Sequence, residues 1–182
     1  MLLGMESVTV IPGNWWILKV GNLRDPDPRD RKRADRKAGI MSGVIYYGKG
    51  TKLGDVVENT SEGIYGTINR HFLDSVQTSA IPIGFRQDIH KGTAYIRSNV
   101  SGEVKDYEIE IQKVDLGSVQ KNKGLVLKVV DEELLSLTSG IVQGMSGSPI
   151  IQDGKLIGAV THVFINDPSR GYGIFIENML GR

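Results

Sequence analysis

The stretch from Gly144 to Gly154 constrains the fold of this chain most, because it joins a glycine-rich turn to two apolar runs. The sequence Gly-Met-Ser-Gly-Ser-Pro occupies residues 144–149. Its glycines permit a tight backbone turn with unusual dihedral angles. Asp153-Gly154 then forms a strong two-residue hairpin signal between Pro-Ile-Ile-Gln and Lys-Leu-Ile-Gly-Ala-Val. The stretch therefore predicts a turn, a strand and a β-hairpin in direct succession.

The serine of this turn is a candidate nucleophile. A turn of this composition can point the Ser146 hydroxyl outward and aim the amides of Gly144 and Ser146 at one spot, as an oxyanion hole requires. The same pattern also suits a plain tight turn between strands, because a motif gains its meaning from its structural context. Ser146 is thus the candidate nucleophile, and Gly144 and Ser146 are the candidate oxyanion-hole donors.

Short apolar runs with turn punctuation continue through most of the chain, which contains 23 glycines. They predict an all-β fold with very little helix. The run at 80–85 contains Pro82, which favours an edge position, and the runs at 93–97 and 107–114 are expected to pair as a hairpin. Asp131 is expected to cap a short helix. Strands are expected at 40–47, 63–68, 80–85, 93–97, 107–114, 124–130 and 173–176.

The first 38 residues differ from the rest of the chain. Residues 24–37 read Arg-Asp-Pro-Asp-Pro-Arg-Asp-Arg-Lys-Arg-Ala-Asp-Arg-Lys and show no amphipathic period. A basic arm for nucleic acid or a membrane surface is one interpretation. A solvated, disordered segment is favoured, because four aspartates dilute the positive charge. The expected organisation is an irregular segment at 1–38 and a folded domain at 39–182.

Composition excludes several functional classes. With 22 basic and 21 acidic residues the net charge is +1, which argues against a dedicated nucleic-acid binder. The absence of cysteine excludes disulfides, thiolate metal sites and cysteine catalysis. The three histidines show no metal-ligand spacing, so neither a metal nor a cofactor is expected. No apolar run is long enough to span a membrane, and no signal peptide is recognisable, so the chain as written is expected to stay in the cytosol.

Residues 140–168 resemble a known peptidase signature. They read Gly-Ile-Val-Gln-Gly-Met-Ser-Gly-Ser-Pro-Ile-Ile-Gln-Asp-Gly-Lys-Leu-Ile-Gly-Ala-Val-Thr-His-Val-Phe-Ile-Asn-Asp-Pro. This stretch is similar to the C-terminal signature of the SpoIVB-type serine peptidases, the stage IV sporulation protein B enzymes of endospore-forming bacteria. The resemblance continues through 171–174 and 176–180, and more weakly upstream to Gly39. It implies a chymotrypsin-like double β-barrel, and here the first barrel is expected to be incomplete.

The resemblance also implies catalytic roles. Ser146 matches the family nucleophile, and Asp131 lies where the family places its orienting carboxylate, a role that can coexist with a helix cap. The family's histidine comes from an upstream segment like Ala-Leu-Gly-His, which is missing here. Its expected place by spacing is near Met5. His162 is the remaining candidate base in the motif region, although the family carries this histidine in addition to the catalytic one.

The other two histidines, His71 and His90, read as loop residues. A frame-shift would explain the missing segment. When plausible codons for residues 1–17 are read two nucleotides later, they can give Ala-Leu-Gly-His-Gly-Val-Ser-Asp-Ser-Asp-Thr-Gly-Glu-Leu-Val-Asp. We therefore interpret the segment up to about residue 37 as out-of-frame translation, with a second indel restoring the frame before Gly39.

The implied function is that of a serine endopeptidase. By resemblance, its partner is a protein substrate, a regulator of an intramembrane protease complex in the space around the forespore. Cleavage of that regulator activates a late sporulation sigma factor. The membrane anchor and PDZ domain of the resembling enzymes have no counterpart in this sequence. Without the histidine segment the activity is expected to be impaired, and the alternative is a non-catalytic remnant that binds peptides or proteins.

Overall fold

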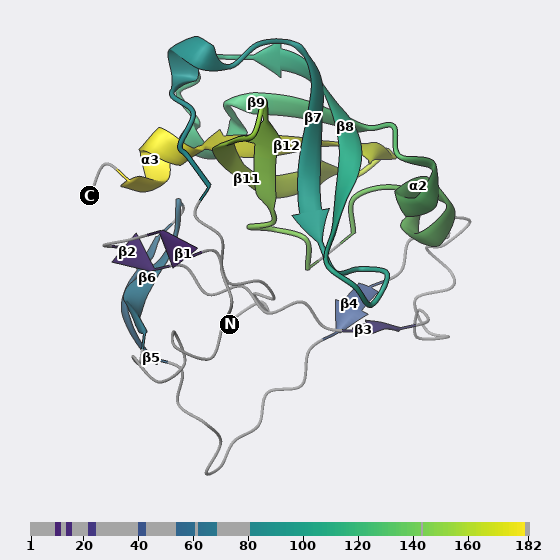
Figure 1. Ribbon diagram of the computed structural model, residues 1–182, viewed down its shortest axis with the longest axis horizontal. Helices are drawn as coiled ribbons and strands as arrows, with labels where there is room; N and C mark the ends of the chain where they lie inside the picture. The colour runs from purple at the N-terminus through teal and green to yellow at the C-terminus, as the bar shows by residue number, and fades with distance from the viewer. Residues whose placement is uncertain are drawn as a thin grey trace.

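The C-terminal half of the chain forms a β-barrel, and short N-terminal strands form separate small sheets (Figure 1). The computed structural model describes residues 81–142 and 144–180, together with the shorter segments 10–11, 14–15, 22–24, 40–42, 54–60 and 62–68. Met5, His71 and most of the charged run therefore lie outside the described residues, as does the greater part of the strand expected at 40–47.

Six antiparallel strands close the barrel in the order β10-β11-β12-β9-β8-β7. Closure comes from the pairing of β10 with β7, where Ile150 lies opposite Ile96. The expected hairpin between the runs at 93–97 and 107–114 is present as β7 and β8. The strands are β7 (Gly92–Ser98), β8 (Lys105–Val114), β9 (Leu125–Val129), β10 (Pro149–Gln152), β11 (Lys155–Phe164) and β12 (Asp167–Phe175).

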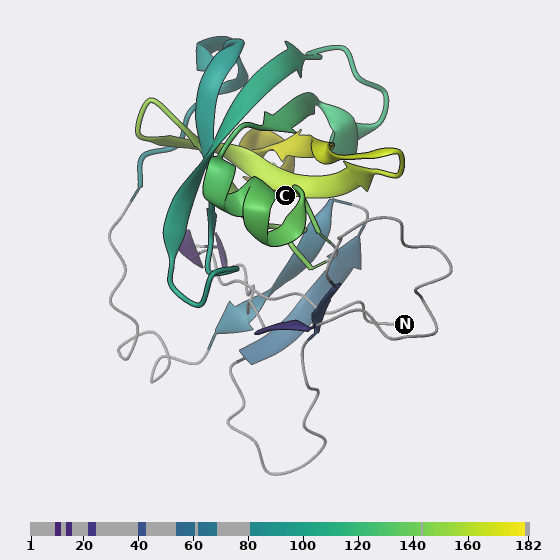
Figure 2. The ribbon, with the colours of Figure 1, turned by 90° about the vertical axis from the view of Figure 1, so that its right-hand side faces the viewer.

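The N-terminal sheets are small and open among the described residues. One sheet has the order β1-β2-β6-β5, and β3 pairs with β4 in a second, two-stranded sheet. Figure 2 shows both on one side of the barrel. An open sheet beside a closed barrel agrees with the expectation of an incomplete first barrel. The strands are β1 (Val10–Ile11), β2 (Asn14–Trp15), β3 (Asn22–Arg24), β4 (Ile40–Ser42), β5 (Gly54–Thr60) and β6 (Gly63–Ile68).

Alternating side chains of the strands fill the barrel. On β8, Tyr107, Ile109 and Ile111 are at most 1% exposed, whereas Glu108 and Glu110 face solvent. This period of two places one face of the strand in the core, as the sequence predicted. Leu125, Leu127 and Ile150 contribute fully buried side chains from other strands of the barrel.

Two α-helices and two short 3-10 turns complete the described structure. Asp131 caps α2 as expected. The helix α3 was not predicted, and the final strand ends at Phe175, one residue earlier than expected, because Ile176 begins α3. The elements are α2 (Glu132–Thr138), α3 (Ile176–Leu180), η2 (Arg86–Asp88) and η3 (Lys121–Lys123).

The strand expected at 80–85 is wrong over the part that the structure describes. Only a single parallel bridge forms there, between Ile83 and Leu156. The Pro82 carbonyl accepts a hydrogen bond from the Leu156 amide at 2.8 Å, and the Gly84 amide donates to the Leu156 carbonyl at 3.0 Å. Pro82 has no N–H to continue a ladder, so this segment contacts β11 only locally.

The hairpin that follows the serine turn forms as the sequence predicted. Asp153 and Gly154 have φ angles of 50° and 73°, and Gln152 pairs with Lys155 on either side of them. Positive φ at both central residues is what a type I′ turn requires. The turn thus fixes the register of β10 against β11, the strand on which the serine turn rests.

Candidate active site

The turn between α2 and β10 presents Ser146 to solvent. Gly144 and Gly147, on either side of it, have φ angles of 107° and 89°, which side chains other than glycine rarely adopt. Between them Met145 is only 1% exposed and anchors the turn in the core. The two glycines allow the backbone to bend, and the buried Met145 side chain fixes the turn to the core. Ser146 therefore lies at the outer corner of the turn.

Backbone hydrogen bonds fix the turn on β11. The Gly147 amide donates to the Val160 carbonyl at 2.6 Å, and the Val160 amide donates to the Ser148 carbonyl at 2.9 Å. Within the turn, the Ser148 amide donates to the Met145 carbonyl at 3.0 Å. The position of the Ser146 backbone is therefore set by a strand of the closed barrel.

Two amides of the turn remain available as donors. The amides of Met145 and Gly147 are hydrogen-bonded to the Val142 and Val160 carbonyls. Among the acceptors that the structure describes, none takes a hydrogen bond from the amide of Gly144 or Ser146. Free, fixed N–H groups beside a serine are the donors that stabilise the oxyanion of an acyl-transfer intermediate. The sequence suggested the same two amides as oxyanion-hole donors, and that role stays a prediction.

The Ser146 hydroxyl already has a partner. Its Oγ donates to the backbone carbonyl of Thr161, 2.9 Å away on β11. A backbone carbonyl accepts a hydrogen bond but does not act as a general base near neutral pH, so this contact orients the hydroxyl without activating it. Sequence reasoning did not identify Thr161, because the contact depends on the register between the turn and β11.

His162 follows Thr161 on β11 and pairs with Tyr172 of β12. Partial burial lowers its pKa, and the nearby ammonium of Lys123 lowers that pKa further. The imidazole is therefore neutral at pH 7, the form that can accept a proton. Among the described residues, however, no hydrogen bond joins its ring to Ser146, and the role of His162 as a base stays a prediction.

His90, the other described histidine, lies away from the serine turn. Its Nε2 lies 2.9 Å from Oδ2 of Asp153 at the tip of the β10–β11 hairpin. The described residues also hold no cluster of three or more His, Cys, Asp or Glu side chains able to bind a metal ion.

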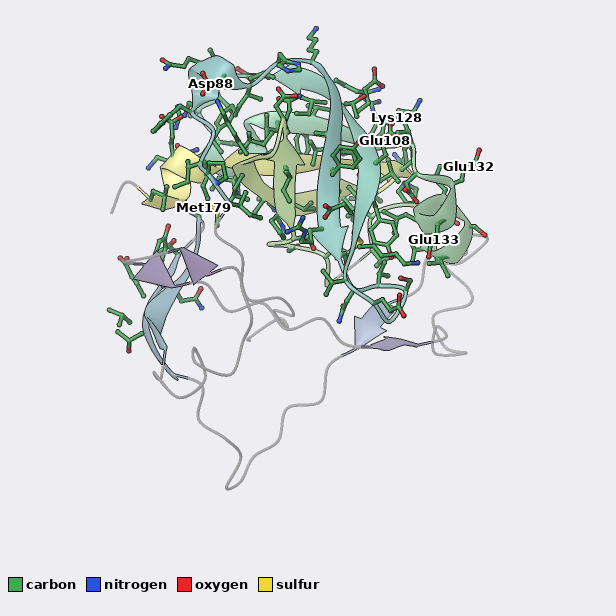
Figure 3. The ribbon with its side chains drawn as sticks, viewed as in Figure 1. Asp88, Glu108, Lys128, Glu132, Glu133 and Met179 are labelled. Atoms are coloured by element: carbon green, nitrogen blue, oxygen red, sulfur yellow. The ribbon has the colours of Figure 1, made fainter. Side chains whose placement is uncertain are left out.

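Asp131 is the N-cap of α2. Its Oδ1 accepts the Leu134 amide at 2.9 Å, and its Oδ2 accepts the Glu108 amide of β8 at 3.2 Å. Figure 3 shows the acidic side chains of Glu108, Glu132 and Glu133 around this end of the helix. Both carboxylate oxygens accept backbone hydrogen bonds, so the expected helix cap is confirmed. The additional role of Asp131 in orienting a histidine stays a prediction.

An exposed serine on a glycine turn that rests on a six-stranded barrel fits a serine peptidase domain with a chymotrypsin-like fold. The family comparison is more specific. Residues 28–180 match the model of the SpoIVB peptidase S55 family, and the chain belongs to this family. The match begins ahead of Gly39, where the sequence predicted the domain boundary.

Solved structures support the fold. The chain is similar to the active form of the Rv3671c protease from M. tuberculosis, with a TM-score of 0.51 and 14% identity over 70% of this chain. It is also similar to an inactive serine-to-alanine variant of Rv3671c from M. tuberculosis H37Rv, with a TM-score of 0.50 and 13% identity over 70% of this chain. The chain spans 56% and 62% of the length of these two structures.

No curated protein matches the sequence. Within the described part of the chain, no helix combines the length and the apolar character needed to cross a membrane.

Proposed function

We propose that this chain is a serine endopeptidase domain in which Ser146 attacks a peptide carbonyl of a regulatory protein. The turn that exposes Ser146 beside two amides that no described acceptor pairs carries the proposal. Attack by Oγ forms a tetrahedral intermediate, whose oxyanion the amides of Gly144 and Ser146 stabilise. Collapse of the intermediate releases the amine and leaves an acyl-enzyme, which water then hydrolyses.

Family membership is the basis for proposing a regulatory substrate. SpoIVB-type peptidases resemble this chain in the serine motif and in the strands that follow it. We infer that the substrate is a regulator of an intramembrane protease complex and that its cleavage activates a late sporulation sigma factor. The support for this inference is the family match alone.

In this proposal, the chain as given has only residual peptidase activity. The Ser146 hydroxyl donates to the Thr161 carbonyl, and no described imidazole receives its proton. An enzyme of this class that lacks its base loses on the order of 10⁶ in turnover, because the members of the triad act as a unit. The same observation supports a second candidate function, a protein that binds peptides beside Ser146 without cutting them.

A fluorophosphonate probe distinguishes the two functions. An activated serine displaces fluoride from the probe phosphorus and becomes covalently labelled. We expect slow labelling of the full chain that disappears in Ser146→Ala. The control Ser136→Ala removes an exposed serine on α2 and should label like the unmodified chain. Complete absence of labelling would contradict the peptidase proposal and favour the peptide-binding candidate.

A further inference from the structure

A cleft of about 430 Å³ is lined in part by β11, the strand that supports the serine turn. It is lined by residues 119–123, together with Glu62 and His162. We call it the lysine cleft, after Lys121 and Lys123. The charges of this cleft come from segments that are distant in sequence from the serine motif, so the motif itself does not reveal them.

The lysine cleft and the serine turn both contact β11. The Ser146 hydroxyl contacts the Thr161 carbonyl at 2.9 Å, and the next residue, His162, lines the cleft. On the other side, the Thr161 hydroxyl donates to the Asn122 carbonyl of the cleft wall at 2.6 Å. Thr161 thus contacts both the serine turn and the cleft wall. This shared contact at Thr161 relates the cleft to a peptide bound at Ser146.

The two lysines differ in how their charge is compensated. The ammonium of Lys121 lies 3.6 Å from a carboxylate oxygen of Glu62, and its side chain is 61% exposed. The ammonium of Lys123 lies 5.2 Å from the centre of the Tyr172 ring, and no described carboxylate pairs with it. A ring face holds a cation in place without neutralising it. Among the described residues, the Lys123 ammonium is therefore the charge of the cleft that has no carboxylate partner.

The other polar groups of the cleft are compatible with an anionic guest. His162 is neutral at pH 7, since burial and Lys123 both lower its pKa, and a neutral imidazole can donate one N–H. Lys121 can exchange its contact with Glu62 for an incoming carboxylate, since the pair is exposed on the lysine side. Among the described residues that line the cleft, Glu62 is the single acidic one, and its carboxylate already lies 3.6 Å from the Lys121 ammonium.

We propose that the lysine cleft selects an acidic side chain, Asp or Glu, close to the scissile bond of the protein substrate, with Lys123 as its principal partner. The inference rests on the proposed function, because it assigns the cleft to the substrate of Ser146. A basic substrate side chain would meet the unpaired ammonium of Lys123 and be repelled. Specificity thus comes from the loop before β9 and from β12, not from the serine turn.

The test measures binding, so that it is independent of turnover. Fluorescein-labelled hexapeptides of alanine, with Glu, Gln or Lys placed at each position in turn, are titrated into the full chain carrying Ser146→Ala, with fluorescence anisotropy as the readout. At one or two positions we expect Glu to bind about fivefold or more tighter than Gln, the scale of one partly exposed ion pair. Lys at the same positions should bind more weakly than Gln.

Charge reversal at Lys123 gives the sharper result. In Lys123→Gln the preference for Glu over Gln should disappear, and in Lys123→Glu the preference should change to Lys, an outcome that unfolding cannot produce. The matched control Lys128→Gln removes an exposed lysine of β9 outside the cleft and should leave the preference unchanged.

Three results would overturn the proposal: no preference for Glu at any position, a preference that persists in Lys123→Glu, or no binding by any peptide. The outcome is separate from that of the fluorophosphonate experiment. Labelling of Ser146 without an acidic preference would remove the cleft assignment and keep the peptidase. An acidic preference without labelling would keep the cleft and favour the peptide-binding candidate.

Discussion

Asp131 combines two structural contacts that can be separated from any catalytic role. Its carboxylate caps α2 through the Leu134 amide and holds the Glu108 amide of β8. We expect Asp131→Ala to reduce the free energy of unfolding by about 1 kcal/mol, the usual cost of losing an N-cap side chain. Asp131→Asn should keep most of that stability, because asparagine caps about as well as aspartate. Urea unfolding of the three proteins measures the difference.

A matched control lies in the same helix. Glu132→Ala removes an exposed acidic residue of the first turn of α2 but leaves the cap in place. It should cost less than Asp131→Ala, because a charge near a helix N-terminus contributes only a few tenths of a kcal/mol to about 1 kcal/mol. Equal losses for both variants would show that the cap contacts of Asp131 contribute nothing beyond helix-dipole electrostatics.

At the scale of elements, one ion pair joins the β10–β11 hairpin to the start of β7. His90 Nε2 lies 2.9 Å from Oδ2 of Asp153, and its Nδ1 lies 3.0 Å from the Lys91 carbonyl. These two neighbours are acceptors at short distance and favour the doubly protonated ring, whereas the donor nitrogen Nε2 of Gln152 lies farther away, 3.4 Å from Nδ1. The Lys91 hydrogen bond and then the Asp153 hydrogen bond raise the pKa of His90 above its ordinary value of 6.5.

A raised folded-state pKa gives the stability a definite dependence on pH. The contribution of His90 is fully present below its ordinary pKa of 6.5 and is lost as the pH rises through the higher folded-state pKa. We therefore expect His90→Ala to lower the melting temperature more at about pH 5.5 than at about pH 8.5. Thermal denaturation followed by circular dichroism measures both differences.

Asp153→Asn serves as the control for this pair. Asparagine tolerates the positive φ of the turn, but it removes the charge that faces His90. In that background the pH dependence of the His90→Ala effect should shrink. A reduction in melting temperature that is the same at both pH values would contradict the role assigned to the pair.

Local chemistry explains which elements the sequence could predict. The Asp153-Gly154 turn, the alternation on β8 and the Asp131 cap depend on neighbouring residues, and all three formed as expected. The strand expected at 80–85 did not form, because Ile83 pairs with β11 at one bridge only. The sequence around Ile83 carries no signal for this long-range pairing. The helix α3 was missed because five residues after a strand carry little helical period.

The same distinction applies to the candidate site. Ser146 and its flanking glycines are contiguous, so one motif suggested the nucleophile and its amide donors. The contact between Ser146 and the Thr161 carbonyl spans 15 residues. Lys123 lies in η3, before β9, and its ammonium lies over the ring of Tyr172 on β12. These side chains come together only when the barrel closes. Their charges could therefore not be assigned to the site from sequence alone.

At the scale of the whole molecule, the expected division between residues 1–38 and 39–182 remains a prediction, and most of the first segment lies outside the described residues. This expected division has a direct consequence for catalysis. The serine turn, its β11 support and the barrel are in place, whereas the replacement of the upstream histidine segment by a frame-shift is a hypothesis from the sequence. Any defect should therefore be confined to the base and be repairable.

Replacing residues 1–17 with the in-frame segment Ala-Leu-Gly-His-Gly-Val-Ser-Asp-Ser-Asp-Thr-Gly-Glu-Leu-Val-Asp, and restoring the frame through residue 37, should raise peptidase activity by several orders of magnitude. A base that removes the Ser146 proton would replace the unproductive contact with the Thr161 carbonyl, and triad members act as a unit. The measurement compares autocleavage and hydrolysis of a generic peptide by the two chains, with Ser146→Ala in each as the blank. In the restored chain, the Asp131 carboxylate would orient the imidazolium of the restored histidine. Asp131→Asn should therefore keep the fold and lower turnover. Robust, Ser146-dependent cleavage by the chain as given would contradict this reasoning and identify another base, with His162 the first to substitute.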